Sequence, residues 1–115
     1  MNTPISFEIK QLLYDKGWRY ELGFDETGYR VEHSLAEQRW NEGNFTYVDI
    51  TIAEVVMWLY EKHGVWIYAE RYSTLFRPYA EEIGDERFGK WEGHKYNSPT
   101  EAYEAAILYT LNNLI

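Results

Sequence analysis

The chain has 115 residues, no cysteine and a formal net charge of −8, with 19 acidic side chains against 11 lysines and arginines. This length fits one domain, and we expect a single α+β domain over residues 1–115. The absence of cysteine excludes thiol catalysis, cysteine-bound zinc and iron–sulfur clusters. The acidic excess opposes direct binding to nucleic acid and to anionic membranes.

Aromatic residues are unusually frequent, with five Trp, eleven Tyr and five Phe. Tyr and Trp combine a large apolar surface with a polar group, so they suit half-exposed sheets and binding faces as well as cores. The first ten residues lack the basic and apolar segments of a signal peptide. No apolar run approaches the length of a membrane span. We therefore expect a cytoplasmic protein with aromatic interaction surfaces.

The first predicted elements are a helix and a hairpin. Ser6 is a typical N-cap, and apolar residues at helical spacing predict a helix over residues 7–16, ended by Gly17. Large and polar side chains then alternate over residues 18–24 and 29–33. The turn-rich residues between these two runs predict an antiparallel hairpin.

The middle of the chain begins without a clear period. We expect residues 34–44 to form a loop that can include a helical turn, and residues 45–50 to form a short strand. Thr51 and Glu54 then make a capping box in front of an apolar stripe, which predicts a helix over residues 52–63.

A second strand-rich region follows. Residues 65–72 carry large side chains on both faces, which predicts a central strand. Residues 75–83 are the expected partner, with Pro78 indicating an edge or a bulge. Residues 88–96 predict a weaker additional strand, because glycines interrupt them.

The last predicted element is a helix over residues 99–113. It opens with a second capping box, made by Ser98 and Glu101. Its alanine-rich face is suited to close packing on a sheet. Leu108 and Ile115 fall in or beside its polar arc, so they are either frayed into solvent or part of a homodimer contact.

Together these elements predict an α+β fold in the order α-β-β-(β)-α-β-β-(β)-α. We expect an antiparallel sheet of about four to six strands, with three helices mainly on one face.

Three segments carry a resemblance to a known group of proteins. They are ISFEI with Leu12, Leu13, Lys16 and Gly17; TIAEV with Trp58, Leu59, Glu61, Lys62, Gly64 and Ile67; and SPTEAYEAAI. The chain resembles small acidic proteins of unknown function from gut anaerobes and their phages and mobile elements. The resemblance implies a cytoplasmic accessory protein and supplies no catalytic residues.

No motif predicts a catalytic, cofactor or metal site. Residues 84–91 nearly match a phosphate-binding P-loop, but Trp91 replaces the Ser or Thr that would hold magnesium. We therefore expect a turn between strands. His33, His63 and His94 are too widely spaced for a local metal motif. His94 is a candidate for general acid–base chemistry, or a solvated strand residue.

The candidate contact residues are aromatic. Trp66, Tyr68 and Tyr72 share one face of a predicted strand, and Trp91 is expected on a neighbouring strand. If the helices cover only the opposite face, these residues form an exposed platform that can stack on sugars, bases or protein side chains. Otherwise the 34–44 segment or another chain covers them.

Three functions follow as hypotheses. The sequence favours a non-enzymatic protein-interaction or accessory module that contacts a protein partner through Trp66, Tyr68, Tyr72 and Trp91. The first alternative is an acidic phage-type inhibitor that mimics nucleic-acid charge. The second is a small-molecule-binding protein with an aromatic platform, or an enzyme that uses His94. No cofactor is expected in any of the three.

Overall fold

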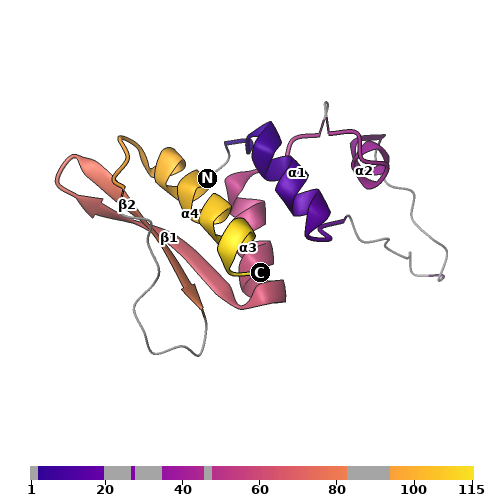
Figure 1. Cartoon of the computed structure of the whole chain (residues 1–115). Helices are drawn as coiled ribbons and strands as arrows, with labels where there is room; N and C mark the ends of the chain where they lie inside the picture. Colours follow the sequence, from indigo (N-terminus) through magenta and orange to yellow (C-terminus); the bar gives the residue numbers. More distant parts are fainter. Residues whose placement is uncertain (1–2, 20–26, 28–34, 46–47, 83–93) are drawn as a thin grey trace.

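The computed structural model describes residues 3–19, 27, 35–45, 48–82 and 94–115. Over these residues the chain forms four helices and one two-stranded antiparallel sheet. Helices α3 and α4 lie on one side of the hairpin, and α1 lies beyond them (Figure 1). The elements are α1 (Phe7–Asp15), α2 (Leu35–Asn41), α3 (Ile52–His63), β1 (Val65–Tyr72), β2 (Leu75–Glu82) and α4 (Pro99–Asn113).

Side-chain caps start three of the helices, as the sequence predicts. The Ser6, Thr51 and Ser98 hydroxyls accept hydrogen bonds from backbone N–H groups three residues onward, at 3.4, 3.3 and 3.2 Å. Each bond satisfies a donor that has no partner within its helix. Helix α3 ends at Gly64, whose φ of 65° is left-handed. The expected helices over 52–63 and 99–113 are confirmed, and the one expected over 7–16 ends at Asp15.

The β1–β2 hairpin is antiparallel, with Tyr72 opposite Leu75 at its turn end and Val65 opposite Glu82 at its open end. Ser73 and Thr74 form the two-residue turn. Ser73 has a φ of 60°, a left-handed conformation that favours glycine. A positive φ at the first central position is the requirement of the type II′ hairpin turn, where glycine is preferred.

We therefore expect Ser73→Gly to raise the free energy of unfolding by up to about 1 kcal/mol, because the strain of the left-handed serine exceeds the entropy lost by glycine. Thr74→Gly is the control, since Thr74 does not share the positive φ. It should lower stability by about 0.5–1 kcal/mol. Urea unfolding of both variants measures the difference, and a destabilised Ser73→Gly variant contradicts this account of the turn.

The predicted sheet of about four to six strands with three helices is wrong for the described residues, which form a two-stranded sheet and four helices. Strand β1 is therefore not central: within the described chain it pairs with β2 alone. The expected partner strand is confirmed as β2.

Residues 45–50 were expected to be extended, but Phe45 and Val48–Ile50 carry no strand. Val48 N–H donates to the Phe45 carbonyl at 3.2 Å, which is a turn contact. Phe45, Val48 and Ile50 are nevertheless buried. The apolar character of the segment therefore indicates burial but not the backbone conformation.

Some expected strands lie outside the described residues. Of the hairpin expected over 18–24 and 29–33, only Trp18 and Arg19 are described, and neither is in a strand. Of the strand expected over 88–96, the described end includes Tyr96. The backbone of Tyr96 exchanges two hydrogen bonds of 2.8 Å with Phe76, so it forms an isolated bridge at the edge of β2 that faces away from β1.

Helix α2 replaces the expected loop over residues 34–44. Its Trp40 is fully buried, and the indole Nε1–H donates to the Trp18 carbonyl at 2.9 Å. Trp40 also packs against Trp18 and Phe45, at ring-centroid distances of 5.0 and 4.7 Å. Contacts of Trp40 with Trp18 and Phe45 leave no helical period in the sequence, so the helix depends on tertiary packing.

The core is a single cluster that joins the helices to one face of the hairpin. The fully buried side chains with the largest volumes include Trp40, Ile9, Leu13, Ile50, Ile52, Leu59, Ile67, Ile107 and Leu111. Because the core occupies this face of the hairpin, it determines which strand residues are left for contacts elsewhere.

Candidate interaction surface on the hairpin

Alternate residues of the hairpin point to opposite sides of the sheet. One side packs on the helices, because Val65, Ile67 and Ala80 are buried there. The opposite side, called the outer face below, consists of Trp66, Tyr68, Glu70, Tyr72, Leu75, Arg77, Tyr79 and Glu81. The register thus brings the three predicted aromatic residues of β1 onto one face, and it adds Tyr79 from β2.

The outer face is partly open to solvent. Trp66 is 39% exposed and Tyr72 is 52% exposed. Between them, Tyr68 and Tyr79 stack with their ring centroids 5.0 Å apart and their planes at 11°. Stacking of cross-strand neighbours limits the motion of both rings, so this part of the face is a rigid apolar platform.

Helix α3 extends the platform. The Tyr60 ring is 44% exposed and lies edge-on to Trp66, at 5.5 Å between centroids. Sequence reasoning missed Tyr60 because its position on the exposed side of α3 resembles that of any solvated helix residue. Only the turn at Gly64 brings α3 and β1 together at this point. The residue opposite Tyr68, Tyr79, could have been found once the strand register was known.

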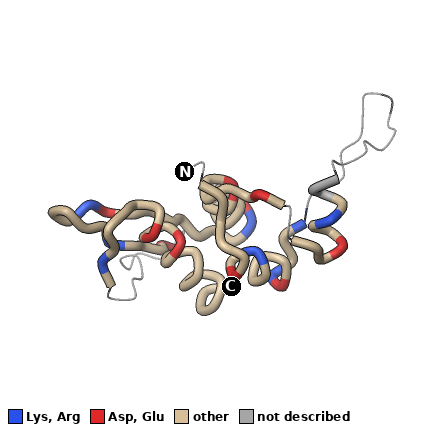
Figure 2. The backbone as a smooth tube through the Cα atoms, turned by 90° about the horizontal axis from the view of Figure 1, so that it is seen from above, with Lys and Arg blue, Asp and Glu red and all other residues tan. Residues whose placement is uncertain are grey.

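Two cations already lie over the ring of Tyr72, the other exposed aromatic residue of the outer face. The Arg77 guanidinium carbon lies 4.9 Å from the centroid of Tyr72, and Lys95 Nζ lies 4.0 Å from it. Arg77 Nη1 also donates to the Tyr79 hydroxyl at 3.1 Å. The turn end of the outer face therefore holds two cations beside one carboxylate, Glu70, despite the acidity of the whole chain. Figure 2 shows acidic and basic residues scattered along the described chain, with both signs on the hairpin.

The ionisation of Tyr68 reflects its position. Burial, with a smaller contribution from the negative charge of Glu81 and neighbouring groups, raises the pKa of the Tyr68 hydroxyl above 10.0. The hydroxyl therefore stays neutral throughout the physiological range. The platform is uncharged at its centre, with Glu81 on one side and Arg77 on the other.

The other predicted site residues are not part of this platform as far as the chain is described. Trp91 lies outside the described residues. His94 is exposed and directly precedes Lys95, so it lies in the segment that approaches the turn end of the hairpin. The role of His94 in acid–base chemistry stays a prediction.

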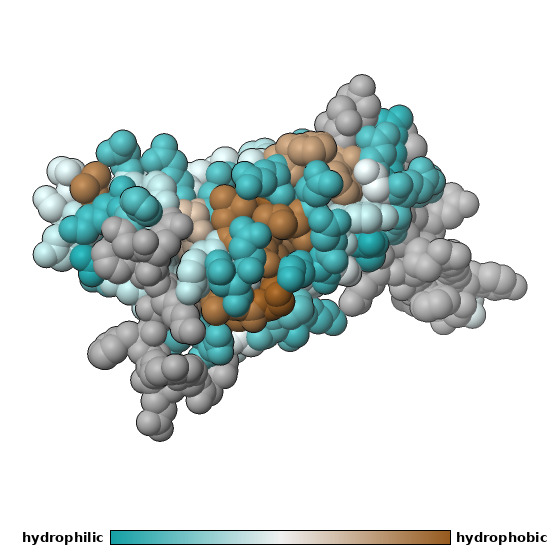
Figure 3. All heavy atoms as spheres, viewed as in Figure 1, coloured by the Kyte–Doolittle hydropathy of each residue, from teal (hydrophilic) through white to brown (hydrophobic). Residues whose placement is uncertain are grey.

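Leu108 and Ile115 are half-buried and pack against the core, so they do not fray into solvent. Lys16 Nζ donates to the main-chain oxygen of Ile115 at 2.7 Å, which ties the end of the chain to α1. Figure 3 shows an apolar area bordered by hydrophilic residues near the middle of the view, where α4 lies. A self-contact through Leu108 and Ile115 stays a prediction.

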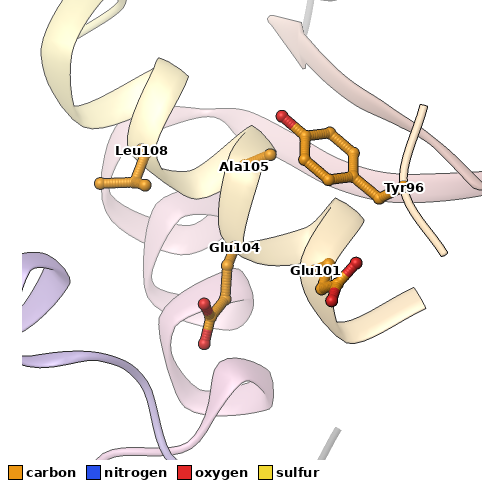
Figure 4. A pocket seen from close by; sticks show the side chains of 5 residues that line it. All are labelled: Tyr96, Glu101, Glu104, Ala105 and Leu108. Carbon is orange, nitrogen blue, oxygen red and sulfur yellow. The ribbon is translucent and has the colours of Figure 1, made fainter. Parts of the chain in front are cut away.

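A cavity of about 320 Å³ opens beside α4. Its lining residues are Tyr96, Glu101, Glu104, Ala105 and Leu108 (Figure 4). Burial, and secondarily the charge of Glu101, raises the pKa of Glu104 above its ordinary value of 4.5. The Glu101 carboxylate accepts a hydrogen bond from the Asn97 backbone N–H at 3.3 Å, so it helps to cap the helix. One of the two carboxylates that line the cavity is thus already engaged in capping α4.

The raised pKa of Glu104 has a measurable effect on stability. The folded state holds the proton more tightly than the unfolded state, so ionised Glu104 opposes folding and stability falls as the pH rises above 4.5. We expect Glu104→Gln to raise the melting temperature at pH 7, and this gain to vanish below about pH 4. Glu61→Gln, in an exposed position on α3, is the charge-matched control. A Glu104→Gln variant no more stable than this control at pH 7 contradicts the expectation.

The described residues contain no group of three or more His, Cys, Asp or Glu side chains that could hold a metal ion. None of the described helices combines the length and the apolar character needed to cross a bilayer. Comparison of the chain with protein-family models, curated proteins and solved structures found no match.

Proposed function

We propose that this chain is a cytoplasmic, non-enzymatic protein-interaction module, and that the outer face of the hairpin docks its partner. The observation that carries the proposal is the partial exposure of Trp66 and Tyr72 on a face whose opposite side contains the core. Tyr, Trp and Arg are the residue types that most often dominate the energy of protein interfaces. All three are present on this face.

The rigidity of the face also supports docking. Its aromatic side chains stand on paired strands, and Tyr68 and Tyr79 are already stacked. An aromatic ring that is fixed before binding loses little conformational entropy when a partner covers it. The cytoplasmic placement is part of the proposal, because a chain without cysteine needs no oxidising compartment.

The charge distribution on this face favours docking over nucleic-acid mimicry. A mimic needs a row of carboxylates spaced like phosphates, whereas the stacked tyrosines separate Glu70 from Glu81, and Arg77 lies opposite Glu70. Lys95 adds a second cation beside Tyr72. A basic nucleic-acid-binding enzyme would be repelled by the positive charges of Arg77 and Lys95 at the turn end of the hairpin.

The test is affinity capture of the tagged chain from a lysate of its own host, treated with nuclease and analysed by mass spectrometry. We expect one stoichiometric partner with the wild type and its loss with Trp66→Ala/Tyr72→Ala. The matched control is Phe7→Ala/Met57→Ala, because Phe7 (60%) and Met57 (45%) are large exposed side chains outside the hairpin. It should retain the partner.

Each substitution in the two double variants should change the free energy of unfolding by no more than about 1 kcal/mol, since all four side chains are partly exposed. This check separates lost binding from lost folding. Retention of the partner by Trp66→Ala/Tyr72→Ala would place the interface elsewhere. A wild-type chain that captures nothing would instead favour a small-molecule role, with the cavity beside α4 as the first place to examine.

A further inference from the structure

Cations lie over two tyrosine rings of this chain. Arg77 and Lys95 approach the Tyr72 ring, and the Arg19 guanidinium carbon lies 3.5 Å from the centroid of Tyr14. The attraction comes from the negative face of an aromatic ring and is strongest for tryptophan. Trp66 is the exposed tryptophan of the outer face, and Tyr60 contacts it edge-on, leaving it 39% exposed.

A carboxylate accompanies Trp66. Glu81 is its direct cross-strand partner in the register, so both side chains are on the outer face. Directly opposed side chains in an antiparallel pair have Cβ atoms about 4.5–5.5 Å apart. The other carboxylate of this face, Glu70, stands opposite Arg77. The open end of the hairpin therefore pairs an aromatic ring with an acid, where the turn end pairs an aromatic ring with cations.

We infer that Trp66, Tyr60 and Glu81 form a site for an arginine side chain on the partner protein. The inference rests on the proposed function and names the chemistry of the partner. The guanidinium stacks on the exposed indole while its N–H groups donate to the Glu81 carboxylate. Arginine fits better than lysine, because a planar guanidinium can stack and form a two-pronged hydrogen bond at the same time.

The charge of the whole chain favours the same partner. A net charge of −8 attracts basic segments over a distance of about 10 Å at moderate ionic strength. The cations near Tyr72 repel a second basic group at the turn end. The two ends of the outer face thus differ in charge, and this difference directs a basic side chain to the end that carries Trp66.

The test is an NMR titration of the full chain with the peptide acetyl-Gly-Arg-Gly-Arg-Gly-amide. The comparison peptide has citrulline, which is planar and similar in shape but uncharged, in place of arginine. We expect saturable shifts of the Trp66 indole N–H, and an affinity at least about tenfold higher for the arginine peptide. Equal binding of the two peptides, or shifts that bypass Trp66, would overturn the inference. Equal binding would point to stacking of a neutral planar group.

Two variants test whether the Glu81 carboxylate is the charge that binds arginine. Glu81→Gln should lower the affinity for the arginine peptide by at least about threefold and leave the citrulline peptide unaffected. Glu82→Gln removes the same charge from the next residue, which is on the opposite side of the sheet, and should bind as the wild type does. Identical affinities of the two variants would overturn the role of Glu81.

The outcome also separates this inference from the proposed function. If Trp66→Ala/Tyr72→Ala loses the captured partner while Glu81→Gln keeps it at full affinity, the docking face stands and the arginine site fails. If Trp66→Ala/Tyr72→Ala keeps the partner, the proposed function fails whatever the peptides do.

Discussion

Replacement of Trp40 by alanine is expected to lower the free energy of unfolding by about 3–5 kcal/mol. The indole is fully buried, and it contacts Trp18, Tyr14 and Phe45 through its ring. Its removal leaves a large cavity, and it deprives the Trp18 carbonyl of the donated hydrogen bond. Both losses act on the same place, where α2 packs against α1 and the segment at Phe45.

Chemical denaturation followed by circular dichroism measures this loss. Trp66→Ala is the matched control, because it deletes the same side chain from the outer face and should lower stability by less than about 1 kcal/mol. If Trp40→Ala unfolds like the control, α2 is not anchored by its tryptophan. If Trp66→Ala is as damaging as Trp40→Ala, Trp66 belongs to the core and the docking face is wrong.

Ala106→Leu is expected to lower the free energy of unfolding by about 1–3 kcal/mol, because it adds three carbons to a packed interior. Ala106 is buried in the core cluster on α4, which packs on both strands of the hairpin and on α3. A larger side chain must displace α4 from the elements on which it packs. The neighbouring Ala105 lines the open cavity beside α4, where added carbons have room.

Ala105→Leu is therefore the control for helix propensity and hydrophobicity, and it should change stability by less than about 1 kcal/mol. Thermal unfolding of the two variants under the same conditions gives the comparison. Equal losses would mean that the cavity closes around Ala105 in solution, and a stable Ala106→Leu variant would mean that α4 is loosely packed.

The three helix N-caps predicted from the sequence are confirmed by the structure. Ser6, Thr51 and Ser98 act through hydroxyl groups three residues from their partners, so the whole interaction is encoded within one turn. The strand over Val65–Tyr72 and its partner were equally predictable, because alternation and a two-residue turn are local features.

The missed helix and the wrong strand count arise from tertiary contacts rather than from local sequence features. Trp40 holds α2 through contacts with residues 22 positions earlier and five positions later, which no local pattern reports. Phe45, Val48 and Ile50 are all buried, although Phe45 and Val48 would face opposite sides of a strand, and the Val48 N–H donates to the Phe45 carbonyl in a turn contact.

The candidate site divides in the same way. The sequence by itself determined that Trp66, Tyr68 and Tyr72 share a face, since side chains two residues apart on a strand must do so. Only the tertiary structure decided which face the helices cover, that Tyr60 and Glu81 join Trp66, and that cations occupy Tyr72. Those choices depend on how separate elements pack, and packing energies are summed over contacts between residues distant in the chain.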